Sequence, residues 1–275
     1  MKLGFIDYYL DEWHANHYPT LLRELSGGEI EVAYAYAETD APNGLTTDAW
    51  CQKNNVQRVN SIAELVALAD GIIVLAPDNT ERHEELCRLP LQSGKRVYVD
   101  KTFAPDAATA ARLFRLAQAH GTPCYSTSAL RYAAEYQDID PNTVRAVSSW
   151  GPYDFETESV HQLEPILTMI HAAPLRVMMH TCPGWYTLTI EFADGRMATI
   201  SGFAENWNFS MQLALSDAAR TIQVQSDYFC GFLQELVRFF RTGEARVPHS
   251  TTEDIMAVRA AGCRAMTAPG TWVTV

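Results

Sequence analysis

Short apolar runs alternate with helical patterns along the first 125 residues. The apolar runs predict strands at Lys2–Ile6, Ile30–Ala37, Gly71–Ala76, Arg96–Val99 and Thr122–Ser126. The third run is apolar throughout, as is typical of a central parallel strand buried on both faces. Between the strands, apolar spacing and stop or cap signals predict helices ending near Leu25 and over Ser61–Ala69, Thr80–Leu89 and Pro105–His120. This alternation predicts a Rossmann-type doubly wound parallel sheet with right-handed crossovers.

From about Thr143 the pattern changes to strand-rich segments in which apolar and polar residues alternate. Strands are expected at Val144–Trp150, Trp185–Phe192, Met197–Gly202, Ser210–Ser216 and Thr221–Gln225, and helices at Ser159–His171, Phe229–Arg241 and Thr252–Thr267. Asp194-Gly195 is a strong hairpin signal between two of the strands. We therefore predict a first domain over 1–125 and an α+β domain with a mostly antiparallel sheet over 126–275. The last helix, 252–267, is a candidate to pack back on the first domain.

The turn after the first strand contains no glycine. The chain has none between Gly4 and Gly27, and the turn instead reads Asp7-Tyr8-Tyr9-Leu10-Asp11-Glu12. A dinucleotide fingerprint here would be Gly-x-Gly-x-x-Gly, because bare backbone must approach a pyrophosphate at the helix N-terminus. Carboxylates repel a pyrophosphate, although they also stabilise a helix N-terminus. If these side chains point to solvent, the backbone is left free; both interpretations stay open.

Three segments are expected to meet at the carboxyl ends of the strands, where ligands bind in such sheets. They are the turn at 7–14, the segment 77–83 and Asp100-Lys101-Thr102. Lys101 is a candidate base there, or else a surface lysine paired with Asp100. Glu38 ends the second strand, where an acid that binds ribose would stand, and such an acid favours NAD over NADP.

Composition excludes several classes of function. The net charge of −12 argues against binding to nucleic acid or to an anionic membrane. No apolar stretch approaches ~20 residues, and the chain lacks the pattern of a secretory signal. The six cysteines are scattered without a C-x-x-C pair, which favours a reducing cytoplasm. His14, His17, Asp11 and Glu12 follow no metal-ligand spacing, so no metal site is expected.

The order of several segments resembles the Gfo/Idh/MocA oxidoreductases, the family of glucose–fructose oxidoreductase and inositol dehydrogenase. The segments that carry the resemblance are Ser61–Leu65, Gly71–Pro77, His83, Ser93–Thr102, Pro105–Ala119, Ser159-Val160-His161 with Glu164, and Gly243–Val258. The segment ending in Asp100-Lys101-Thr102 is similar to the family's Gly-Lys-x-Val-x-x-Glu-Lys-Pro. The segment at His161 is similar to its Gly-x-His-x-x-Asp.

The resemblance implies a set of site residues and a chemistry. Lys101 and His161 would be the catalytic residues that orient a carbinol and take its proton as hydride leaves for nicotinamide. Glu158, three residues before His161, is a candidate replacement for the family's missing carboxylate, and Glu164 could also orient the histidine. The positions expected at the cofactor, from the resemblance and the sheet pattern, are Asp7, Tyr9, Glu12, Glu38, Pro77, His83 and Asp100. A homodimer or homotetramer is also implied.

The sequence departs from the family where the cofactor should lie. No alignment places a glycine in the first turn, the proline after Lys101 has become Thr102, and Thr157 stands where the family has an aspartate. Two hypotheses therefore stay open. The chain is an oxidoreductase that acts on a sugar, cyclitol or related polyol with NAD, or it is a degenerate member that binds a small molecule or partner subunit without redox turnover.

Overall fold

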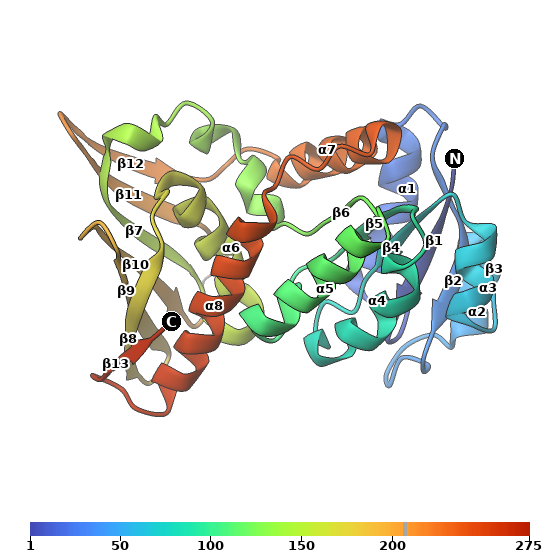
Figure 1. The fold of residues 1–275 in the computed structure, drawn as a ribbon, viewed down its shortest axis with the longest axis horizontal. Helices are drawn as coiled ribbons and strands as arrows, with labels where there is room; N and C mark the ends of the chain where they lie inside the picture. Colours follow the sequence, from blue (N-terminus) through green and yellow to red (C-terminus); the bar gives the residue numbers. More distant parts are fainter. Residues whose placement is uncertain (206–207) are drawn as a thin grey trace. The chain divides into compact units, whose positions relative to one another are not determined.

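The computed structural model describes residues 1–205 and 208–275 (Figure 1). Contacts divide the chain into two compact units. The first unit comprises Met1–Ser126 and Leu233–His249, and the second comprises Thr127–Phe232 and Ser250–Val275. Residues 233–249 therefore cluster with the first unit, whereas the sequence pattern grouped them with the second.

The first unit is built on a six-stranded parallel sheet in the order β3-β2-β1-β4-β5-β6. Its strands are β1 (Lys2–Asp7), β2 (Glu31–Ala37), β3 (Gln57–Arg58), β4 (Gly71–Val74), β5 (Arg96–Val99) and β6 (Cys124–Tyr125). This is the strand order of the dinucleotide-binding Rossmann fold, 3-2-1-4-5-6. Its switch point lies between β1 and β4. The chain adds β2 and β3 on the β1 side of this point, and β5 and β6 on the β4 side.

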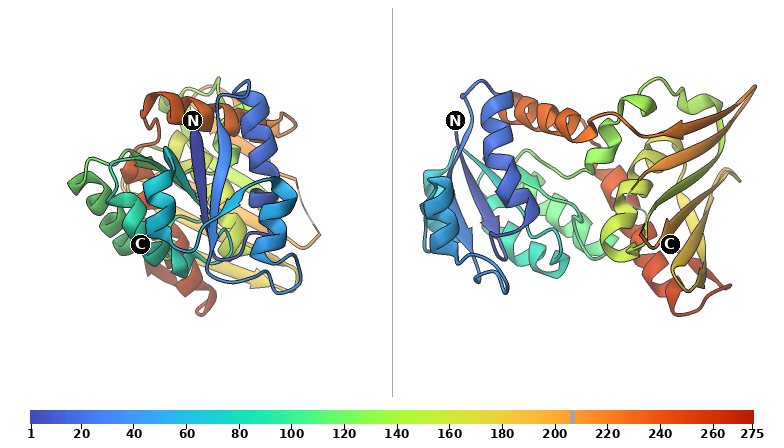
Figure 2. Two further views of the ribbon diagram at one scale, coloured as in Figure 1. Left: turned by 90° about the vertical axis from the view of Figure 1, so that its right-hand side faces the viewer. Right: turned by 180° about the vertical axis from the view of Figure 1, so that it is seen from behind.

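Helices cover both faces of this sheet (Figure 2). They are α1 (Trp13–Leu25), α2 (Thr47–Asn54), α3 (Ile62–Leu68), α4 (His83–Leu91) and α5 (Ala107–Ala119), with a 3₁₀ turn η1 (Thr80–Arg82) before α4. α3, α4 and α5 contact one another in one layer, and α1 lies on the other face. The predicted cap is present, because Ser61 Oγ accepts a hydrogen bond from Glu64 N at 3.1 Å. Gly4 lets α3 approach β1, since a Cβ there would collide with the Leu65 side chain.

Residues 233–249 belong to the first unit because the end of helix α7 (Tyr228–Thr242) is anchored there. A Cβ on Gly71 would meet the Phe240 ring, so this ring packs directly over β4. The rings of Phe239 and Tyr125 lie 4.8 Å apart in an edge arrangement. Arg241 Nη2 adds an ion pair to Glu29 Oε2 at 2.7 Å. Such buried aromatic contacts fix which unit this segment joins.

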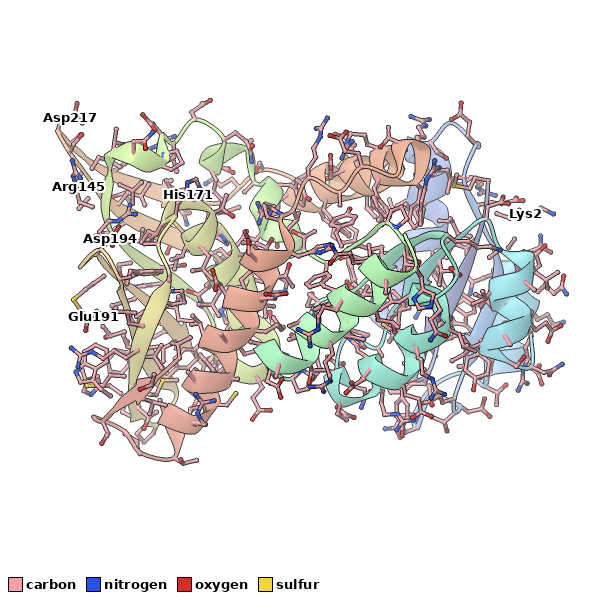
Figure 3. The ribbon with its side chains drawn as sticks, viewed as in Figure 1. Lys2, Arg145, His171, Glu191, Asp194 and Asp217 are labelled. Carbon is pink, nitrogen blue, oxygen red and sulfur yellow. The ribbon has the colours of Figure 1, made fainter. Side chains whose placement is uncertain are left out.

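The second unit contains a seven-stranded sheet in the order β12-β11-β7-β10-β9-β8-β13. The strands are β7 (Val144–Pro152), β8 (Pro174–Cys182), β9 (Trp185–Phe192), β10 (Met197–Phe203), β11 (Ser210–Leu215), β12 (Ala219–Gln223) and β13 (Trp272–Thr274). All neighbouring pairs are antiparallel except β7 with β10. The predicted Asp194-Gly195 turn joins β9 to β10, with Gly195 at φ 84° (Figure 3).

Helix α6 (Phe155–Met169) and most of α8 (His249–Met266) belong to the second unit. A Cβ on Gly262 of α8 would collide with the Phe155 ring of α6, so the two helices are in close contact. Arg259 Nε also donates to Glu156 O at 2.7 Å. The last helix therefore packs against α6 in its own unit; its packing on the first domain stays a prediction. No helix in the described part of the chain is both long and apolar enough to cross a bilayer.

Candidate functional site

Asp7 stands at the switch point with its side chain turned into the protein. It ends β1 and is 1% exposed. Its Oδ1 accepts hydrogen bonds from Tyr8 N at 2.7 Å and from Ala76 N at 3.0 Å, and so joins the ends of β1 and β4. Its Oδ2 is buried without a hydrogen-bond partner among the described residues. Burial, followed by the charge of Glu12, raises the pKa of Asp7 well above its usual value, which favours the protonated carboxyl.

Glu12 occupies the N-terminus of α1 with its own carboxylate. It is the N-cap residue, and its two oxygens accept hydrogen bonds from His14 N, at 2.6 Å, and from Ala15 N. A carboxylate in this position satisfies amide donors that a helix otherwise leaves open. The side chain is only 8% exposed. Burial outweighs the lowering effects of His14 and the two amides, and the pKa of Glu12 rises to about 7.

His14 links the first turn of α1 to the end of β5. Its Nδ1 lies 2.8 Å from Asp100 Oδ2, and both side chains are largely buried. The other oxygen of Asp100 lies near the hydroxyls of Tyr18, at 3.4 Å, and Tyr98, at 3.3 Å. Burial lowers the pKa of His14, but the charge and hydrogen bond of Asp100 outweigh it, and the net shift is upward. Burial raises the pKa of Asp100, and His14 outweighs that effect to leave it lowered. The pair is therefore an imidazolium–carboxylate pair.

Asp11, the third carboxylate of the turn, has a different role from Asp7 and Glu12. Its Oδ2 accepts from Leu45 N at 2.7 Å and its Oδ1 from Asn16 Nδ2 at 2.9 Å. Asn16 Oδ1 in turn accepts from Trp50 Nε1 at 2.9 Å. Asp11 thus ties the turn to the loop before α2. The possibility that all three carboxylates point to solvent is excluded, because Asp7 and Glu12 are buried.

Glu38, just after β2, is held by an arginine. Arg82 Nε and Nη2 donate to its two carboxylate oxygens at 2.8 and 2.7 Å, a bidentate pair. Arg82 Nη2 also donates to Glu85 at 2.9 Å. The ribose-binding position predicted at Glu38 is therefore occupied by the protein's own arginine, which the sequence reasoning missed.

His83 and Pro77 are both buried, and His83 is fully so. The His83 Nδ1 atom lies 2.9 Å from Phe103 O, and its Nε2 lies 2.6 Å from Leu75 O and 3.1 Å from Ala76 O. The ring joins the end of β4 to the segment after β5. Both ring nitrogens of His83 face backbone carbonyls, and its contact with a cofactor stays a prediction. Tyr9, by contrast, is half-buried at the turn, and burial followed by nearby carboxylates raises its pKa.

Lys101 follows β5 directly after buried Asp100, and its side chain is half-buried. Asp100 faces His14, and the charge of Lys101 also helps to lower the pKa of Asp100, so the catalytic role of Lys101 and its pairing with Asp100 both stay predictions. In the second unit, His161 Nδ1 lies 2.7 Å from Ser128 Oγ and its Nε2 lies 3.7 Å from Glu158 Oε2. Glu158 therefore faces His161, as the sequence suggested.

Glu164 is bound by Arg131 and Thr127. Its Oε1 accepts from Arg131 Nε at 2.6 Å and from Thr127 Oγ1 at 2.7 Å. Ser128, which does contact His161, was missed by the sequence reasoning. So was the His14–Asp100 pair, which joins residues far apart in the sequence.

The Rossmann fold implies a dinucleotide with its pyrophosphate at the N-terminus of α1. In this structure the His14 and Ala15 amides are hydrogen-bonded to Glu12 instead. A pyrophosphate does not fit there while the Glu12 carboxylate remains in place. In the described residues there is also no group of three or more His, Cys, Asp or Glu side chains that could hold a metal ion.

Comparison with known proteins agrees with this fold. Residues 14–128 match a family model described as "Oxidoreductase family, NAD-binding Rossmann fold". The chain also resembles solved structures at low identity. A myo-inositol dehydrogenase from Lactobacillus casei, in complex with NAD(H) and myo-inositol, is 11% identical with a TM-score of 0.81. The alignment covers 100% of this chain and 96% of that one.

Two further solved structures show the same likeness. The myo-inositol 2-dehydrogenase from Lactobacillus plantarum is 15% identical, with a TM-score of 0.78 and 100% and 99% of the two chains covered. The WlbA dehydrogenase from Bordetella pertussis, in complex with NADH and UDP-GlcNAcA, is 11% identical, with a TM-score of 0.79 and 100% and 98% covered. A search of curated protein sequences finds no significant match. The family match covers residues 14–128, which are similar to the NAD-binding Rossmann part of the Gfo/Idh/MocA oxidoreductases.

Proposed function

We propose that this protein is an oxidoreductase that acts on a sugar, cyclitol or related polyol with NAD as its hydride carrier. The observation that carries the proposal is the 3-2-1-4-5-6 strand order, which puts the ends of β1 and β4 at the switch point where dinucleotides bind. The family match supports the redox class. The relatives named above, which bind myo-inositol or a UDP-sugar, support the substrate class.

Lys101 and His161 are the residues proposed to handle the hydroxyl proton of the substrate. NAD, when bound, supplies the hydride acceptor or donor. Either Lys101 Nζ or His161 Nε2 takes the proton from the carbinol. Ser128 fixes the ring of His161 through Nδ1, and Glu158 Oε2 lies 3.7 Å from its Nε2. Glu158 is thus proposed to act in place of the family's aspartate.

Assembly and location belong to the same proposal. We propose a cytoplasmic homodimer or homotetramer. Trp150, which is 53% exposed, lies 5.0 Å from the Phe203 ring on the second sheet, and Trp185 stacks on the other side of Phe203. Such an aromatic patch is typical of an interface between subunits. The thiols of Cys51, Cys87, Cys124, Cys182 and Cys263 are free, which supports a reducing compartment.

Titration with NADH and NADPH, followed by nicotinamide fluorescence, tests the redox class. We expect NADH to bind and to be formed from NAD in the presence of a cyclitol, an aldose or a UDP-sugar. Lys101→Ala should lower kcat by about 100-fold or more, because a positioned acid–base group contributes roughly that factor. The matched control is the replacement of an exposed lysine of α2, Lys53→Ala, and this variant should keep full activity. Retained activity in Lys101→Ala would remove this lysine from the site.

The second candidate function is a degenerate member that binds a small molecule without redox turnover. The observation that favours it is the Glu12 carboxylate at the N-terminus of α1. Under this alternative, neither nucleotide binds at millimolar concentration and none co-purifies with the protein. The titration therefore separates the two functions.

A further inference from the structure

We propose that Glu12 is an internal anion that competes with the dinucleotide pyrophosphate for the N-terminus of α1, and so sets the affinity of this chain for NAD(H). The proposal rests on the proposed function, because it concerns regulation of the same site. Its basis is the contact between the Glu12 carboxylate and the amides of His14 and Ala15, the donors an anion would use at a helix N-terminus. Glu12 therefore selects against any ligand that presents a phosphate there.

The helix itself is long enough and correctly aimed for an anion. α1 runs for 13 residues from the switch point, and its dipole favours negative charge at this end. Glu12 provides that charge intramolecularly, at an effective concentration that a free nucleotide must overcome. The neighbouring residues Asp11 and Trp13 reach the surface, the latter with 53% of its area exposed.

Asp7 supplies a second, independent indication that a phosphate belongs here. Asp7 is only 1% exposed, and its Oδ2 has no hydrogen-bond partner in the described part of the chain. Burial and the charge of Glu12 raise its pKa well above the usual value, which favours the protonated form. A protonated carboxyl is a hydrogen-bond donor that lacks an acceptor at this point. A phosphate oxygen that replaced the Glu12 carboxylate would be such an acceptor.

The surrounding charges fit the exchange of one anion for another. Asp100 also faces Glu12, but its charge is balanced by His14 at 2.8 Å. His14 Nδ1 lies 3.6 Å from Glu12 Oε2, so the same imidazolium attracts whichever anion occupies the helix terminus. Removing the Glu12 charge should thus raise the affinity for a pyrophosphate while leaving the remaining charges paired.

The test uses the full-length protein and two probes, NADH and ADP, by isothermal titration calorimetry. ADP carries the pyrophosphate without the nicotinamide, so it reports on this position alone. Glu12→Ser vacates the space and keeps a good N-cap for α1. We expect it to bind both probes at least ~10-fold more tightly than the natural protein, as loss of one close like charge allows. Glu12→Gln, which retains the shape without the charge, should give a smaller gain.

The control variant is Glu24→Gln, which removes the same charge from an exposed position in the last turn of α1 and should change ADP affinity by less than ~3-fold. Circular dichroism confirms that each variant is folded, and Glu12→Gln carries the test if Glu12→Ser is not. Equal, measurable binding by the natural protein and both Glu12 variants would overturn the competition and leave the proposed function standing. No binding of NADH or ADP by any of them at millimolar concentration would overturn both.

Discussion

His14 and Asp100 form a buried ion pair, with 2.8 Å between Nδ1 and Oδ2, that joins α1 to the end of β5. Removal of one partner from such a pair leaves an uncompensated charge in the interior. His14→Ala should therefore lower the free energy of unfolding by about 3 kcal/mol, measured by urea denaturation. His17→Ala, on the exposed side of the same helix, should change it by less than about 1 kcal/mol.

A second substitution separates the charge effect from the loss of packing. In the double variant His14→Ala with Asp100→Asn, neither charge of the pair remains, and much of the lost stability should return. Additive losses would show that the pair is not coupled.

The raised pKa of Glu12 predicts that its contribution to stability is lost as the pH rises. Its pKa is raised from 4.5 to about 7 in the folded protein, so its contribution to stability is fully present below pH 4.5 and is lost as the pH rises to about 7. Glu12→Gln cannot ionise. The free energy of unfolding of this variant, relative to that of the natural protein, should be higher at pH 8 than at pH 5 by about 1–3 kcal/mol. Thermal or urea unfolding at both pH values measures it.

Asp11→Asn is the matched control for that experiment, because the pKa of Asp11 is shifted in the opposite direction and the pH dependence of stability should have the opposite sign. The hydrogen bond from Leu45 N lowers the pKa of Asp11, so this carboxylate stabilises the protein above its unfolded pKa. Its removal should cost stability at pH 8 and little at pH 3. If the free energies of unfolding of Glu12→Gln and of the natural protein differed by the same amount at every pH, the burial of an ionisable Glu12 would be excluded.

Glu38 and Arg82 should together decide between NAD and NADP. Glu38→Ala releases the Arg82 guanidinium, which is 34% exposed, to accept a 2′-phosphate. We expect the ratio of the Kd for NADPH to that for NADH to fall by about 10-fold, measured by fluorescence titration. Glu85→Ala removes the other partner of Arg82 without touching Glu38, and should leave the ratio unchanged. An unchanged ratio in Glu38→Ala would place the ribose elsewhere.

The sequence predicts the parallel sheet well because its signals are local. The apolar run that forms β4 and the Ser61 cap before α3 can each be recognised from a few consecutive residues. Helix α2 and strand β3 were missed because their short segments bury few side chains. Strand β8 was missed because exposed residues interrupt its alternation.

The candidate site could be predicted only by position along the chain. The resemblance located His83 near the cofactor, but it could not indicate that the ring turns inward to the Leu75 and Phe103 carbonyls. The glycine-free turn was evident, whereas the direction of Glu12 depends on the start of α1. The His14–Asp100 contact joins residues far apart in sequence, and no local pattern reports such a contact.

The hydrogen bonds of Asp11 have a consequence for protein engineering. Through Leu45 N and the Asn16 side chain, which itself holds Trp50 Nε1, this residue fastens the first turn to the loop and helix that follow β2. A glycine-rich turn grafted from a relative would cut both attachments at once. A successful chimera must therefore transplant residues 7–12 together with residues 38–50, because the two stretches form one exchangeable module.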